Sequence, residues 1–240
     1  MLLLAVETAT PDTSAALLRD GDLLAEERGA PGRPTAETLL PAVDALLGHC
    51  AVELDALEAF AVSIGPGSFT SLRIGVATVK GLAFGSGRPA VGVPTLRALA
   101  HTAPPGSGPV VSLLDARRGE LYAAAFEGEE LTPAALLPEG VYAIAALRER
   151  LPATCRLTGE GVAICGAALR SALGPGVVCV PTDLGAARAV HVGALGARLL
   201  AQGAGVDAAG LVPRYLRRAQ AEVVRTGRRF ECAGDTPDGG

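Results

Sequence analysis

The stretch FAVSIGPGSFTSLRIG, residues 60–75, joins a mostly apolar run to a segment whose apolar residues have helical spacing. The run at 60–64 predicts a buried strand, because both of its faces are apolar. The glycines at 65 and 67 permit a tight turn, and Ser68 or Thr70 is a suitable helix cap. We therefore expect a strand, a turn and a helix over 70–84 in direct succession, as in α/β folds.

The residues before this stretch predict three antiparallel strands. Apolar runs at 2–6, 13–18 and 23–27 are separated by the turn-forming pairs Pro11-Asp12 and Asp20-Gly21. Runs joined by such turns are typical of a meander.

A helix is then predicted from 35 to 47. Its apolar residues recur at the spacing of one helix face: Leu39, Leu40, Val43, Leu46 and Leu47. Pro41 lies inside this segment, so the helix is either kinked in its first turn or begins near Thr38. A further strand at 90–93 and a helix from Pro94 follow.

The order of three strands, helix, strand, helix, strand, helix is that of a ribonuclease-H-like unit of the actin-like (ASKHA) α/β fold. A Pro- and Gly-rich linker at 103–109 follows, and the cycle then restarts. Strands are expected at 110–114, 121–126, 131–137 and 177–180, and helices at 144–150, 162–173 and 188–201. We thus expect two ribonuclease-H-like domains, each a mixed sheet flanked by helices, at 1–103 and 109–231. A flexible tail is expected at 232–240.

Composition narrows the functional classes. The chain has 240 residues, 49% of them apolar, with 21 basic and 25 acidic residues and a net charge of −4. A protein that binds nucleic acid alone normally has a basic excess, which this chain lacks. The apolar run at 2–6 has no basic leader and ends at Glu7, and no apolar stretch approaches a membrane span. The five cysteines are scattered without a CxxC pair, so we expect a cytoplasmic protein with reduced, buried thiols and no membrane association.

One local segment departs from this charge balance. Residues 214–229 contain six arginines and a single acid, Glu222. They could contact nucleic-acid phosphates within a complex. The alternative is a solvated terminal face that pairs with acids of a partner.

The turn at 65–75 is a candidate nucleotide or anion loop. Gly65, Gly67, Ser68 and Thr70 precede a helix whose free amides and dipole favour an anion. No Gly-Lys-Ser/Thr follows, so it is not a Walker loop. The alternative is a well-capped turn without a ligand.

The two helices at 35–47 and 70–84 are a candidate surface for another protein. The second helix is rich in small residues, and glycines inside a helix cost about 1 kcal/mol each unless a backbone must approach closely. The alternative is that both helices only cover their own sheet. We predict that the partner-binding side chains are Leu39, Leu40, Val43, Leu72, Val76 and Val79.

The sequence resembles the TsaB (YeaZ) family of bacterial tRNA threonylcarbamoyladenosine biosynthesis proteins. The matching stretches occur in the family's order: LAVETAT (4–10), LLP (39–41), GPGSFTSLRIG (65–75), KGLA (80–83), VGVPTL (91–96), DARRGELY (115–122) and PRYLR (213–217). The match covers 1–126 closely and the rest loosely. The family usually has Asp in place of Glu7 and often His near Thr35, so no chemistry is assigned to these two positions.

This resemblance implies a non-catalytic subunit. The related family TsaD transfers the threonylcarbamoyl group to adenosine 37 of tRNAs that read ANN codons, and TsaB supports it as a heterodimer, joined by TsaE. A homodimer is expected when the chain is alone, and tRNA contact only within the complex. No cofactor of its own is implied, and ATP or ADP is expected only at the interface with the partner.

The residues themselves favour the absence of catalysis. TsaD binds a metal through an HxxxH pair, and the matching positions here are Thr95 and Leu99. His49 and His191 are expected to stand alone in apolar surroundings. Glu7 and Asp115 end strands but lack the following glycines of a phosphate loop. Residues 115–120 instead fit a tight hairpin in which Arg117 can pair with Glu120.

Two enzymatic alternatives stay open. One is a metal-dependent TsaD-like transferase or the metallopeptidase after which the superfamily was once labelled. The other is a small-molecule kinase of the actin-like fold, for which the second half is short.

Overall fold

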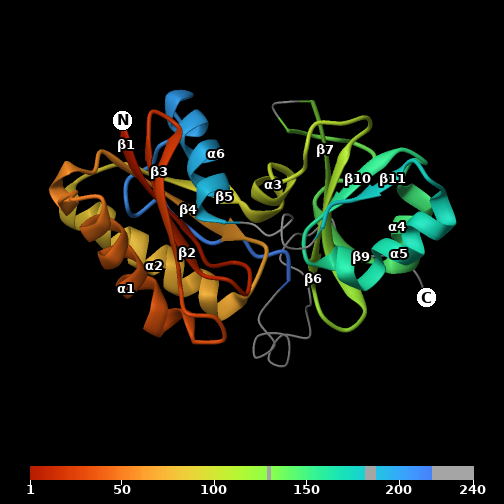
Figure 1. Ribbon diagram of the computed structural model, residues 1–240, viewed down its shortest axis with the longest axis horizontal. Helices are drawn as coiled ribbons and strands as arrows, with labels where there is room; N and C mark the ends of the chain where they lie inside the picture. The colour runs from red at the N-terminus through yellow and green to blue at the C-terminus, as the bar shows by residue number, and fades with distance from the viewer. Residues whose placement is uncertain (129–130, 182–187, 218–240) are drawn as a thin grey trace. The chain divides into compact units, whose positions relative to one another are not determined.

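The computed structural model of the chain describes residues 1–128, 131–181 and 188–217. These residues form two compact units (Figure 1). The first consists of residues 1–101 and 188–213, and the second of residues 102–181 and 214–217. The predicted tail at 232–240 and the arginines beyond 217 lie outside the described residues.

The first unit contains a five-stranded mixed sheet. Its strand order is β3-β2-β1-β4-β5, with β1 antiparallel to β2 and parallel to β4. The strands are β1 (Leu2–Glu7), β2 (Ser14–Arg19), β3 (Asp22–Arg28), β4 (Ala59–Gly65) and β5 (Ala90–Pro94). The helices are α1 (Thr35–His49), the 3-10 turn η1 (Leu54–Ala56), α2 (Phe69–Ser86), α3 (Thr95–Ala100) and α6 (Ala189–Ala201).

Strand alternation divides the core between the two faces of this sheet. On one face, Leu4 and Val6 of β1 and Phe60 of β4 pack in one apolar cluster with α1 and α2. Helix α6 contacts β1, β2, β4 and β5. Its glycines lie against the opposite face, since Gly193 meets Ala5 and Gly196 meets Ala61.

The position of α6 corrects the predicted domain boundary. The sequence assigned 188–201 to the second domain, whereas the helix belongs to the first unit (Figure 1). Polar side chains of β2 and β3 also hold its first turn. The amide of Ala189 donates to Ser14 Oγ at 2.8 Å, and that of Val190 donates to Glu26 Oε1 at 3.1 Å. These contacts, 175 and 164 residues apart along the chain, leave no local pattern in the sequence.

The second unit repeats the same architecture. Its sheet has the order β11-β10-β6-β7-β8, and β9 also pairs with β7. The strands are β6 (Val110–Asp115), β7 (Glu120–Glu127), β8 (Thr132–Pro133), β9 (Gly140–Ala143), β10 (Cys155–Thr158) and β11 (Val177–Cys179), with helices α4 (Ile144–Arg150) and α5 (Gly161–Leu173). With β9 as the third strand, both units have the ribonuclease-H-like order, and the predicted actin-like α/β fold is confirmed.

Two local features were mispredicted, and the choice left open for the start of α1 is decided. The strand expected at 131–137 is only the two-residue β8, and the main third strand is β9. β10 was not predicted, because its four residues are too few to give a distinctive pattern. Helix α1 starts at Thr35 and continues through Pro41. No helix in the described part of the chain is long and apolar enough to span a bilayer.

Candidate partner-binding surface

Five of the six side chains predicted to bind a partner lie in the core. They are almost completely buried beneath α1 and α2: Leu39, Val43, Leu72, Val76 and Val79. The helical spacing identified the apolar face of each helix correctly, but that face covers the sheet. The prediction is therefore wrong for these five residues. Leu40 alone is exposed, at 55% of its surface.

The outer faces of α1 and α2 offer a different set of residues. On α2, Ala77, Gly81 and Gly85 are exposed one turn apart, and a Cβ on either glycine would meet nothing within 4 Å. Phe84 beside them is the most exposed large apolar side chain of the described residues, at 83%. Bare backbone next to an exposed aromatic ring is an arrangement in which a second helix can approach closely.

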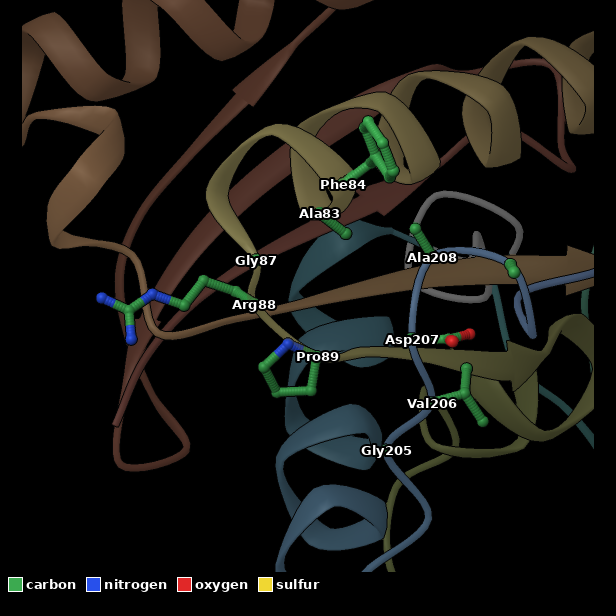
Figure 2. A pocket seen from close by; sticks show the side chains of 10 residues that line it. Ala83, Phe84, Gly87, Arg88, Pro89, Gly205, Val206, Asp207 and Ala208 are labelled. Atoms are coloured by element: carbon green, nitrogen blue, oxygen red, sulfur yellow. The ribbon is translucent and has the colours of Figure 1, made fainter.

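A hollow of about 490 Å³ lies at the carboxyl end of α2 (Figure 2). Its wall is formed by Ala83, Phe84, Gly87, Arg88 and Pro89 on one side and by residues 205–209 on the other. An isolated bridge between Ala90 and Val206 holds this second wall against the end of the sheet. The lining is mostly apolar and continues the exposed face of α2.

The loop predicted to bind an anion is occupied by its own chain. A Cβ on Gly67 would lie 2.3 Å from the carbonyl oxygen of Ala9, and the amide of Ser68 donates to that oxygen at 2.9 Å. Ser68 Oγ also caps α2 by accepting from the amide of Ser71. Gly65 is buried, whereas Ser68 and Thr70 are exposed. These groups fit a packed, capped turn and do not fit a phosphate cradle.

Glu7 is fully buried at the end of β1 beside this loop. Its Oε1 accepts from the amides of Ala9 and Thr10, whereas Oε2 has no hydrogen-bond partner. Burial raises the pKa of Glu7, and the hydrogen bonds oppose that shift only in part. A raised pKa favours the protonated form of this carboxyl group.

The hairpin at 115–120 forms as predicted, but with different ion pairs. Arg117 pairs with Asp115 at 3.0 Å, and Arg217 pairs with Glu120. Arg217 also donates to the carbonyl oxygen of Ala116 at 2.7 Å. Arg214 pairs with Glu139. The described arginines of the basic segment are thus bound within their own unit, an outcome that local charge counting does not reveal.

Comparison with known proteins gives a consistent family. Residues 32–223 match the family model described as TsaD, tRNA N6-adenosine threonylcarbamoyltransferase. The TsaB protein of Escherichia coli is 37% identical over 174 residues, 68% of this chain and 71% of that protein. The chain belongs to the TsaB family. The family was correctly predicted from the spaced motifs of the sequence.

Solved structures agree with TsaB membership. YeaZ from Pseudomonas aeruginosa is 31% identical with a TM-score of 0.73, over 90% of this chain and 99% of that one. Component A of (R)-2-hydroxyglutaryl-CoA dehydratase from Acidaminococcus fermentans has a TM-score of 0.52 at 10% identity, covering 84% of this chain and 99% of that one. The second likeness concerns the fold alone.

The histidines of this TsaB-family chain are arranged differently from the prediction. His49 is exposed and pairs with Glu27 at 2.7 Å. The ring of His191 lies edge-on to that of His101, with centroids 5.8 Å apart. Burial lowers the pKa of both histidines. The charge of Arg198 adds to the pKa shift of His101. His101 and Arg188 add to the shift of His191, whose pKa falls to about 4. Thr95 and Leu99 are completely buried, and the described residues contain no cluster of three His, Cys, Asp or Glu able to hold a metal.

Proposed function

We propose that this chain is a non-catalytic subunit in the biosynthesis of threonylcarbamoyladenosine in tRNAs that read ANN codons. It acts by binding and supporting TsaD, together with TsaE. Membership of the TsaB family supports the process. One observation supports the non-catalytic role: Thr95 and Leu99, which match the metal-binding histidines of TsaD, are buried and provide no imidazole.

The outer faces of α1 and α2 are the proposed docking surface. It comprises Leu40 on α1 and Ala77, Gly81, Phe84 and Gly85 on α2. These residues replace the five core side chains of the sequence prediction. Because the glycines have no side chain, a partner helix can pack against the α2 backbone, and Phe84 can insert beside it. The hollow at 83–89 and 205–209 adds apolar area at one end.

The other proposed partners and ligands each rest on a separate observation. A homodimer is expected when TsaD is absent, because Phe84 and Leu40 would otherwise expose apolar area to water. The net charge of −4 supports tRNA binding only within the complex. A nucleotide at the contact with TsaD stays a prediction. The loop at 65–70 is not proposed as its site, because that loop packs on the chain's own backbone.

The decisive experiment is tRNA modification reconstituted with and without this chain. We expect the product to require it. Phe84→Asp should abolish co-purification with TsaD without a loss of stability, because the ring is exposed. Ile164→Asp, at a half-exposed apolar position of α5 in the second unit, is the matched control and should co-purify normally.

Two results would contradict this function, and a third would reject only the docking surface. The first is unchanged modification when the chain is omitted. The second is a stoichiometric metal ion in the purified chain, which would favour the alternative of a metal-dependent transferase or metallopeptidase. The third, normal co-purification of Phe84→Asp, would reject the docking surface but not the pathway.

A further inference from the structure

The hairpin between β6 and β7 has an unusual backbone. Three successive residues have positive φ: Arg117 at 65°, Arg118 at 59° and Gly119 at 76°. Glycine adopts this region readily, whereas a residue with a Cβ does so at a cost in energy. Two adjacent arginines in this conformation persist only if surrounding contacts hold them, and such strain is concentrated at functional sites.

The contacts that hold the hairpin come from charged side chains beneath it. Asp115 Oδ1 accepts from the amide of Arg117 at 2.7 Å, and the amide of Asp115 donates to Glu160 Oε1 at 3.3 Å. Arg217 donates with one guanidinium nitrogen to the carbonyl oxygen of Ala116 and with the other to Glu120. Arg217 is largely buried and comes from a segment nearly 100 residues away, so it acts as a clamp on the turn.

The acidic and basic side chains of the hairpin differ in their exposure and contacts. The three acids around it, Asp115, Glu120 and Glu160, are each engaged in a contact within the unit. The side chain of Arg117 is 84% exposed although it pairs with Asp115, and Arg118 is also exposed. The tip therefore directs two guanidinium groups toward solvent on an acidic protein.

We propose that residues 117–119 are a phosphate-binding element, with Arg117 and Arg118 as its ligands and Arg217 as its positioning residue. This inference rests on the proposed function, because the phosphate would belong to the tRNA or to a nucleotide used in the modification. Guanidinium groups bind phosphate oxygens in a bidentate manner. Since Arg117 already has the Asp115 carboxylate at 3.0 Å, a further carboxylate from a protein adds little, whereas a phosphate adds more charge and more acceptors.

The test uses the full chain in the reconstituted reaction, with the KM for tRNA and the KM for ATP measured separately. Arg117→Gln/Arg118→Gln should raise one of these KM values at least about fivefold. If the affected KM is that for tRNA, the slope of log KM against log salt concentration should fall by about two, because two phosphate contacts are lost. Arg148→Gln/Arg170→Gln removes the same charge from exposed helix positions of the second unit and should change neither.

Arg217→Met keeps both tip arginines but removes the clamp. It should raise the same KM as the tip variant and accelerate tryptic cleavage after Arg117 and Arg118. If this variant does not fold, Arg217→Lys tests the same point, because an ammonium cannot replace both hydrogen bonds at once.

The outcomes separate the phosphate sources. A raised KM for tRNA assigns the tip to the RNA backbone, and a raised KM for ATP assigns it to a nucleotide. The proposal is overturned if neither KM changes, if the control variant changes equally, or if the tip variant instead loses co-purification with TsaD. Failure of the proposed function is recognised independently, since modification would then continue without the chain.

Discussion

Gly67 lies so close to Ala9 that a Cβ on the glycine would be 2.3 Å from the carbonyl oxygen of Ala9. The amide of the next residue, Ser68, donates to that same oxygen. The turn that begins α2 is thereby packed directly on the loop that follows β1.

Gly67→Ala should consequently destabilise the protein. The backbone of Ala9 cannot move aside without breaking the Ser68 bond, so we expect a loss of about 1–3 kcal/mol from overpacking. Denaturant unfolding would measure it. Gly81→Ala is the matched control, since it fills open space on an exposed helix and should raise stability by about 1 kcal/mol. Equal stability of the two variants would contradict this packing.

Leu72→Ala should act on stability and not specifically on partner binding. Leu72 is 1% exposed in the core under α2, so truncation should cost about 2–5 kcal/mol. At a temperature where the variant is folded, its affinity for TsaD should equal that of the wild type. A specific loss of affinity with unchanged stability would show that Leu72 contacts the partner.

Stability should fall as the pH drops below neutrality because of His191. Its pKa is lowered from 6.5 to about 4 by burial, so the unfolded chain binds a proton that the folded chain does not. The contribution is complete above pH 6.5 and amounts to about 3 kcal/mol lost by pH 4. His191→Gln should flatten this part of the profile, as denaturant unfolding measured across this pH range would show.

Glu7→Gln should not destabilise the protein at pH 7. Burial raises the pKa of Glu7, so its stabilising protonated form is lost as the pH rises from 4.5 through the folded pKa. A neutral amide avoids that loss, and its oxygen can accept the two amides that Oε1 accepts now. Unfolding free energies of the two proteins at pH 5 and pH 8 would measure the effect. A large loss of stability in Glu7→Gln would show that the carboxylate is ionised.

The local patterns of the sequence predicted most elements of both units. The strand, turn and helix at 60–84 match β4 and α2, because an apolar run and a 3.6-residue period are properties of neighbouring residues. The pattern also located the buried face of each helix. It could not show whether that face meets a sheet or another protein, since both require the same apolar residues.

The sequence by itself determined the family, the order of elements and the loss of imidazoles at Thr95 and Leu99. Only the tertiary structure decided that α6 covers the first sheet, that Phe84 and Gly81 form the outer face of α2, and that Arg217 clamps the hairpin at Ala116. The physical reason is the separation along the chain between the residues in contact. Local periodicity follows from backbone geometry within a few residues, whereas these contacts join residues far apart and depend on how whole elements pack.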